Sequence, residues 1–132
     1  MTYADYDRFL QKFHMIKISG PTFKRILNAA TKEAIVEAGK NAGASVPQSF
    51  ILAKMGEIDA TSAVEYLRLM GAYANLFDYS QVAPTGRNSI TLTHDLGLNG
   101  SLFLTSYVES LFKSAGKIVK ISQYENGITV EL

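Results

Sequence analysis

The chain ends in the feature that most restricts its fold, a pair of runs rich in β-branched residues separated by the dipeptide Asn126-Gly127. Asn-Gly tolerates the positive φ angles of the tightest hairpin turns, so it is the strongest short-range signal for a β-hairpin. The runs on either side are KIVKISQY and ITVEL. We therefore predict an antiparallel hairpin over residues 117–132, and we expect any sheet in this protein to contain antiparallel strands.

Apolar residues recur at helical spacing through much of the preceding chain, and start and stop signals divide them into separate helices. Pro21 suits a first helical turn, Thr31 and Asp59 are good N-caps, and Gly56 is a typical stop. Ser101 is expected to begin a later helix. These signals predict helices over residues 20–30, 32–43, 45–56, 60–77 and 101–116, with the first two alternatively joined into one long helix.

Two other segments alternate between apolar and polar residues, which is typical of half-buried strands. They are KFHMIKIS, residues 12–19, and SITLTH, residues 89–94. The stretch 78–88, which contains Pro84 and Gly86, is interpreted as a loop or a short strand. This order of elements predicts an α+β fold, in which several helices pack on a small antiparallel or mixed sheet that includes the C-terminal β-hairpin.

The chain has 132 residues and no internal repeat, low-complexity tract or long linker. A chain of this length can bury a core of its own. We expect a single globular domain over residues 1–132, with residues 1–11 as a helical or frayed lead-in.

The composition is apolar for a small domain, with 47% hydrophobic and 19% charged residues. Apolar surface in excess of what a core needs indicates a self-association surface or an apolar pocket. The formal net charge of +1 provides no strong field for binding nucleic acid or an anionic membrane. The absence of cysteine excludes disulfides, thiolate zinc sites and cysteine nucleophiles.

The first residues, MTYADYDRFLQKF, lack the basic start and apolar run of a signal peptide. The chain also has no apolar stretch long enough for a spanning helix. We therefore expect a cytoplasmic protein with no membrane segment.

The segment HDLGLNGS, residues 94–101, places a histidine, two glycines and a serine where a predicted strand gives way to a helix. Such a junction can hold an anion at the helix N-terminus. It lacks the Gly-Lys-Ser/Thr ending of a phosphate loop and the third glycine of a dinucleotide fingerprint. Ser101 as an N-cap, with Gly97 and Gly100 as turn residues, explains the segment structurally, and an anion site is the alternative.

His94 has the strand parity of Ile90 and Leu92, so we expect it to point toward the core or a pocket. It is either a buried neutral imidazole or a ligand-contacting residue. His14 is the only other histidine, and there is no Gly-x-Ser-x-Gly motif, so we expect neither a metal site nor a catalytic residue. No cofactor is expected, and a small hydrolase around His94 is the least favoured function.

Aromatic residues gather in and after the long predicted helix and again in the later one, where they could line an apolar cavity. The residues expected at such a ligand pocket are Tyr66, Met70, Tyr73, His94, Phe103 and Tyr107, with His94 as the polar anchor. The same side chains would equally suit a core and a dimer interface, because aromatic residues dominate both settings.

The stretch KFHMIKISGPTFKRIL, residues 12–27, resembles the opening of a ribbon-helix-helix DNA-binding protein. The resemblance implies a dimer whose paired strands enter the major groove, with phosphate contacts from Lys12, Lys17, Lys24 and Arg25. Both faces of the predicted strand are too apolar for direct base readout. The long Ala/Gly-rich stretch after the first helix also departs from the short turn of that family.

A second resemblance spans residues 22–132 and rests on element order and glycine placement. The segments VEAGKNAG, LRLMGAYANLFDY, LFLTSYVESLF and VKISQYENGITVEL look like parts of the 4-vinyl-reductase-type small-molecule-binding domains, relatives of the heme-NO-binding folds. The resemblance implies an apolar ligand pocket under the helices and a tendency to dimerise. The closing hairpin of that family commonly carries cysteines, whereas Ser122, Gln123 and Tyr124 stand here, which argues against a metal-bearing version of the site.

These observations favour a non-catalytic ligand-sensing or regulatory domain that binds a small apolar molecule and acts as a homodimer. The alternative is a DNA-binding transcription regulator that uses the N-terminal strand and the first helix.

Overall fold

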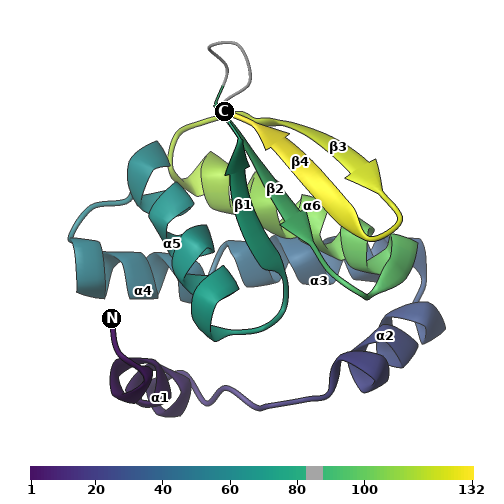
Figure 1. Ribbon diagram of the computed structural model, residues 1–132, viewed down its shortest axis with the longest axis horizontal. Helices are drawn as coiled ribbons and strands as arrows, with labels where there is room; N and C mark the ends of the chain where they lie inside the picture. Colours follow the sequence, from purple (N-terminus) through teal and green to yellow (C-terminus); the bar gives the residue numbers. More distant parts are fainter. Residues whose placement is uncertain (83–87) are drawn as a thin grey trace.

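The computed structural model describes residues 1–82 and 88–132 of the chain (Figure 1). Within these residues the chain forms six helices and four strands. In chain order they are α1 (Tyr3–Lys12), α2 (Gly20–Ala29), α3 (Lys32–Gly43), α4 (Val46–Met55), α5 (Ala60–Tyr73), β1 (Asp78–Val82), β2 (Ser89–Thr93), α6 (Gly97–Ser114), β3 (Lys120–Tyr124) and β4 (Gly127–Glu131).

The four strands form one antiparallel sheet in the order β1-β2-β4-β3. The predicted α+β class and the C-terminal hairpin are both confirmed. The stretch expected to be a loop or short strand supplies the edge strand β1, while Pro84 and Gly86 lie outside the described residues. The tight loop of the hairpin is Glu125-Asn126, one residue earlier than expected, because Gly127 already pairs with Tyr124.

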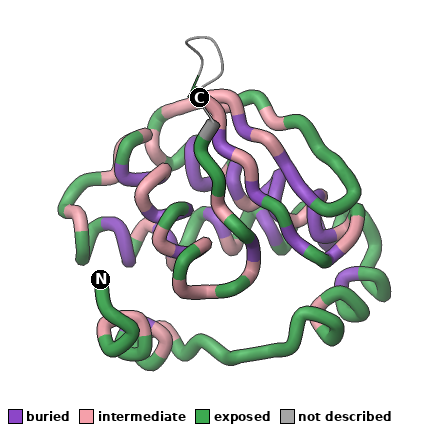
Figure 2. The backbone as a smooth tube through the Cα atoms, in the orientation of Figure 1, coloured by how far each residue is buried: buried purple, intermediate pink, exposed green. Residues whose placement is uncertain are grey.

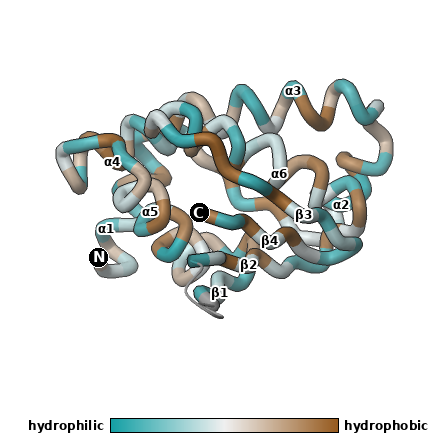
Figure 3. The backbone as a smooth tube through the Cα atoms, turned by 90° about the horizontal axis from the view of Figure 1, so that it is seen from above, coloured by the Kyte–Doolittle hydropathy of each residue, from teal (hydrophilic) through white to brown (hydrophobic). Residues whose placement is uncertain are grey.

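Helix α6 lies between the sheet and α3, so the molecule has three layers here (Figure 3). The central strands β2 and β4 bury their inward-facing residues completely, because alternate residues of a strand share one face. The α6 residues that meet them recur every three or four positions. This core consists of Ile90, Leu92, Ile128 and Val130 from the sheet and Leu104, Val108, Leu111 and Phe112 from α6.

Helices α3 and α6 approach each other closely because α3 presents glycines to its neighbour. A Cβ atom added to Gly39 would lie 2.5 Å from the carbonyl oxygen of Phe103, which is well inside contact distance. Two serines of α6 use this proximity: Ser106 Oγ donates to the carbonyl of Val36 at 2.5 Å, and Ser110 Oγ donates to the carbonyl of Lys40 at 2.7 Å. The sequence KEAIVEAGKNAG therefore folds into a helix whose small-residue face matches α6.

Most of the predicted helix ends are confirmed, because capping depends on residues close in sequence. The side chains of Thr31 and Asp59 accept backbone hydrogen bonds in the first turns of α3 and α5. Gly56 ends α4 with a left-handed φ of 80°. Helices α2 and α3 are separate, and the lead-in is helical from Tyr3 onward rather than frayed, since Thr2 and Asp5 form a capping box at the start of α1.

The predicted strand over residues 12–19 is wrong. Lys12 is the last residue of α1, His14 has a positive φ of 53°, and residues 15–19 have no partner strand among the described residues. Alternation of apolar and polar residues is typical of a strand, but a strand is stable only when it pairs with a neighbouring strand. We call residues 15–19 the arm; it joins α1 to α2 along one side of the molecule and is exposed along its length (Figure 2).

No helix in the described part of the chain is long and apolar enough to cross a membrane.

Candidate functional site

Four of the six residues expected at a ligand pocket lie together where α5 packs on α6. The hydroxyls of Tyr66 and Tyr107 are 2.8 Å apart and share a hydrogen bond. The ring of Phe103 stacks on that of Tyr107, with the ring centres 6.1 Å apart. Met70 follows Tyr66 by one turn of α5, and both side chains are buried. Each of the four contributes to the main hydrophobic core, so the structure brings them together as packed side chains.

The two tyrosine hydroxyls are neutral at ordinary pH. Burial raises the pKa of Tyr66 to about 12 and raises the pKa of Tyr107 well above its usual value. Each hydroxyl satisfies the other, which is how buried polar groups are normally accommodated. The hydrogen bond between these tyrosines therefore links α5 to α6. Because both hydroxyls are neutral, they offer a ligand neither a base nor a charge.

Tyr73 lies apart from these four residues, at the C-terminal end of α5. Its hydroxyl donates to the backbone carbonyl of Met1, and its ring packs edge-on against Tyr3 at 5.0 Å between ring centres. Its role in the structure is to hold the start of α1 against the body of the protein.

His94 also lies elsewhere, in a buried network that joins three segments. Its Nδ1 accepts a hydrogen bond from the amide of Leu96 at 2.9 Å, so the ring proton must be on Nε2. Nε2 is 2.9 Å from Ser101 Oγ, which in turn lies 3.1 Å from the carbonyl oxygen of Gly127. Burial lowers the pKa of His94, which favours the neutral ring that this network requires.

The same network explains the structural roles of the residues in the segment HDLGLNGS. Helix α6 begins at Gly97 rather than at Ser101, so the prediction of Ser101 as an N-cap is wrong. The Gly97 amide donates to the side chain of Asn126 at 3.0 Å and is therefore occupied. A Cβ atom on Gly100 would lie 3.0 Å from His94 Cε1, so the glycine makes room for the imidazole. The segment is a junction between β2, α6 and the hairpin.

A cavity of about 270 Å³ opens between α1 and α4, in a part of the chain that the sequence patterns did not single out. Aromatic rings form its floor: the ring centres of Phe9 and Phe50 are 4.8 Å apart, and those of Phe9 and Phe13 are 5.2 Å apart. The lining residues are Asp5, Arg8, Phe9, Lys12, Phe13, Phe50, Ala53 and Lys54.

The rim of this cavity carries three cations and one carboxylate. The carboxylate of Asp5 accepts hydrogen bonds from the amide and hydroxyl of Thr2, which hold its pKa below the ordinary value, and it forms an ion pair with Arg8 at 3.4 Å. Lys12 and Lys54 have no carboxylate within ion-pair distance among the described residues. Two ammonium groups are therefore available beside an aromatic floor.

The sequence signal that α1 docks against another element lies in the lead-in of the chain. Tyr6, Phe9 and Phe13 are spaced three and four residues apart, which places them on one helical face. Arg8 and Lys12 share an adjacent face at a spacing of four. That pattern predicts a helix that docks through aromatic rings and carries cations beside them.

Among the described residues, no group of three or more histidine, aspartate or glutamate side chains could hold a metal ion. No protein-family model, curated protein or solved structure matches this chain.

Proposed function

We propose that this protein is a non-catalytic regulatory domain that senses a small apolar molecule and acts as a homodimer. The observation that supports it best is the cavity between α1 and α4, whose floor is aromatic and whose rim carries Lys12 and Lys54. Ligand sites are typically concave and apolar with a few polar groups that fix orientation. The ligand class that fits is largely apolar, a small aromatic or short-chain molecule that also carries one anionic group to pair with these lysines.

The size of the cavity limits the ligand. Pockets for drug-sized molecules span roughly 300–1,000 Å³, so a volume of about 270 Å³ suits a ligand near the small end of this class. Its apolar part would cover Phe9, Phe13 and Phe50, and its anionic group would pair with the free ammonium groups. Burial of apolar area supplies most of the affinity in such a site, and the charge pair selects acids over neutral analogues.

Binding at this site has a direct route to the rest of the molecule. Helix α1 is held to the body largely by aromatic side chains, with Phe9 against Phe50 and Tyr3 against Tyr73. A ligand between α1 and α4 adds contacts to both helices and so favours the docked position of α1. Because α1 leads directly into the arm, ligand binding would restrict the position of the arm.

The arm is the feature that supports self-association. Ile16 is 83% exposed, and Met15 and Ile18 are 43% and 46% exposed. In the described chain, the amides of residues 16–18 donate no backbone hydrogen bond. An exposed, extended segment with free amides is a template for pairing with another strand. A second copy is a suitable partner, since antiparallel pairing centred on Ile16 sets Met15 opposite Lys17 and keeps the lysines apart.

A regulatory role is favoured over a hydrolase by the state of His94. Both ring nitrogens are engaged in a structural network, and the histidine is not among the residues that line the α1–α4 cavity. A general base needs a nitrogen free to take a proton from a substrate or water.

The test uses 8-anilinonaphthalene-1-sulfonate, a fluorescent aromatic anion, as the probe. We expect saturable binding to one site per chain. Ala53→Trp, which fills the cavity, should weaken binding at least tenfold, and Lys12→Gln with Lys54→Gln should weaken it about three- to tenfold because one charge pair is lost. Lys113→Gln with Lys120→Gln removes the same charge far from the cavity and should have no effect.

The proposal fails if the Ala53→Trp variant binds the probe as tightly as the unmodified protein while its circular dichroism is unchanged. It also fails if the distant lysine pair weakens binding as much as the cavity pair.

A further inference from the structure

The charges of this chain are strongly segregated along its sequence. Residues 8–32 contain six Lys or Arg and no Asp or Glu, whereas the rest of the chain contains seven Lys or Arg and twelve Asp or Glu. The small net charge of +1 therefore conceals a segment of +6 and a remainder of −5. The cations of the segment are Arg8, Lys12, Lys17, Lys24, Arg25 and Lys32.

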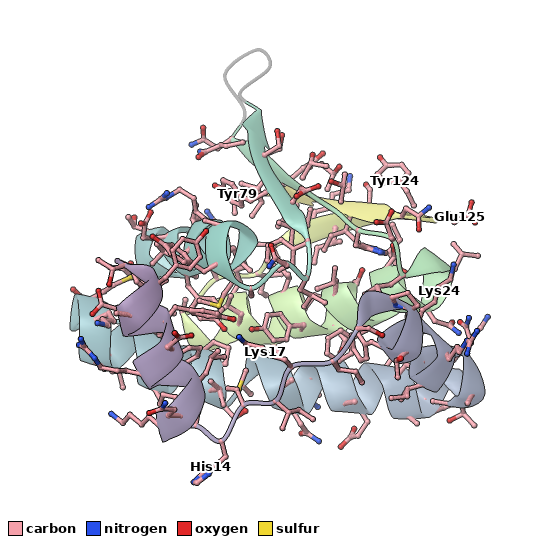
Figure 4. All side chains as sticks on the ribbon, turned by 60° about the horizontal axis from the view of Figure 1, so that its bottom comes forward. His14, Lys17, Lys24, Tyr79, Tyr124 and Glu125 are labelled. Carbon is pink, nitrogen blue, oxygen red and sulfur yellow. The ribbon has the colours of Figure 1, made fainter. Side chains whose placement is uncertain are left out.

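The structure keeps these cations at the surface and on one part of the molecule. All six are exposed, and they belong to α1, the arm, α2 and the first residue of α3. Figure 4 shows Lys17 on the extended chain between α1 and α2, and Lys24 on α2. Among the described residues only Arg8 of this set forms an ion pair, with Asp5. We call this surface the basic edge.

The N-terminus of α6 adds to the positive electrostatic potential of the basic edge. The side chain of Lys24 lies beside Gly97, since a Cβ atom on that glycine would be 3.5 Å from Lys24 Cε. Gly97 is the first residue of α6, an eighteen-residue helix, and the N-terminus of a helix carries a partial positive charge. The positive end of the longest described helix therefore points to the same side as the cations of α2.

We infer that the basic edge binds the phosphate backbone of double-stranded nucleic acid. The cations are spread over α1, the arm, α2 and the start of α3, which suits a linear, repeating polyanion better than a single small anion. Exposed lysine and arginine side chains of this kind bind phosphates by releasing condensed counterions and read no base sequence. Pairing of the arm with a second copy would leave Lys17 available, because it alternates with Ile16 and Ile18.

This inference goes beyond the sensing role and does not depend on the ligand cavity. Lys17, Lys24 and Arg25 do not line that cavity, so their variants separate the two proposals. If both hold, a ligand that fixes α1 also fixes Arg8 and Lys12, two of the six cations of the basic edge.

The test measures the fluorescence anisotropy of a labelled 20-base-pair DNA duplex with the full-length protein. If Lys17, Lys24 and Arg25 each neutralise one phosphate, affinity should fall about fortyfold between 50 and 200 mM salt. The variant with all three changed to Gln should lose at least tenfold in affinity at 50 mM salt and most of this salt dependence.

The matched control replaces Lys113, Lys117 and Lys120 with Gln. These residues lie at the end of α6, in the following loop and in β3, outside the basic edge. The control removes the same charge, so affinity within twofold of the unmodified protein supports the basic edge as the site.

Three results would overturn the inference. The first is no binding to the duplex at 50 mM salt, and the second is an equal loss in the control and in the basic-edge variant. The third is displacement of the duplex by an equal concentration of polyglutamate, which would identify an acidic protein surface as the partner. Binding of the fluorescent aromatic anion, measured on the same variants, reports separately on the cavity.

Discussion

At the scale of single residues, His94 shows how a residue type that suggests chemistry can serve structure alone. Its ring joins the end of β2 to the start of α6 through Leu96 and Ser101, and Ser101 continues the network to the hairpin. Both ring nitrogens are satisfied only while the imidazole is neutral, because Nδ1 must accept a hydrogen bond. The protein should therefore lose stability when the medium favours protonation.

We predict that the free energy of unfolding decreases as the pH falls below about 6.5, the ordinary pKa of histidine. Burial lowers the pKa of His94 in the folded state, so the unfolded chain takes up the proton first and is stabilised by it. The loss continues down to the folded-state pKa and then stops. Urea denaturation between pH 5 and pH 8 measures it.

The comparison variants are His94→Gln and His14→Gln. His14 is exposed and points away from the body (Figure 4), so its replacement should leave the free energy of unfolding at pH 7.5 within about 0.5 kcal/mol of the unmodified value. His94→Gln should remove the pH-dependent component and cost about 1–3 kcal/mol at pH 7.5, since buried partners lose their hydrogen bonds. The same fall in stability below pH 6.5 in His94→Gln as in the unmodified protein would contradict this account of the network.

At the scale of helices and strands, sequence patterns succeed where the cause is local. Thr31, Asp59 and Gly56 mark helix ends because capping and left-handed stops involve residues within one turn. The hairpin is likewise local. Ser101 misleads for the opposite reason: its hydroxyl is used by His94 and by the distant backbone of Gly127, a contact that no local pattern reveals.

The residues expected at the ligand pocket also show this difference between local patterns and long-range contacts. Tyr66, Met70, Phe103 and Tyr107 come together because helical spacing places them on facing sides of α5 and α6. Tyr73 lies apart from them because its hydroxyl donates a hydrogen bond to the backbone carbonyl of Met1, just before α1. The cavity beside Phe9 could not be located from the sequence, since it depends on where α1 docks against α4, a contact between segments forty residues apart.

The α3–α6 contact gives an element-scale prediction. Gly39→Ala should lower the free energy of unfolding by about 1–3 kcal/mol, although alanine favours helix, because the new methyl group would overlap the backbone of α6. Gly20→Ala is the control, since nothing lies within 4 Å of the position that its Cβ would occupy. Thermal unfolding measures both, and an equal effect of the two substitutions would mean that the helices have room to separate.

At the scale of the whole molecule, one body carries most of the core, while a peripheral unit carries most of the surface that we propose to bind partners. The body consists of the sheet with α3 to α6, and the unit consists of α1, the arm and α2 (Figure 1). The cavity lies where the two meet, and the exposed apolar arm and five of the six cations of the basic edge lie on the peripheral unit. This arrangement suits a regulator in which a ligand at the junction sets the position of the surface that engages partners.

Dimerisation through the arm is a prediction at this scale. Ile16→Ser with Ile18→Ser should raise the dimer dissociation constant at least tenfold, because two exposed apolar side chains are lost from each copy. Ile118→Ser is the control, since Ile118 is 95% exposed and lies far from the arm in the chain. Sedimentation equilibrium measures the constant. A dimer unaffected by the arm changes would place the interface elsewhere, and an unmodified protein that is monomeric at 100 μM would contradict the homodimer.

An NMR titration decides whether the junction of α1 and α4 holds a small aromatic anion. The uniformly ¹⁵N-labelled protein would be titrated with 8-anilinonaphthalene-1-sulfonate and its amide shifts followed. We predict that the largest changes fall on Phe9, Phe13, Ala53 and Lys54, with smaller ones extending into the arm. Changes centred on Phe103 and Tyr107, or scattered over the surface without saturation, would contradict binding at this junction.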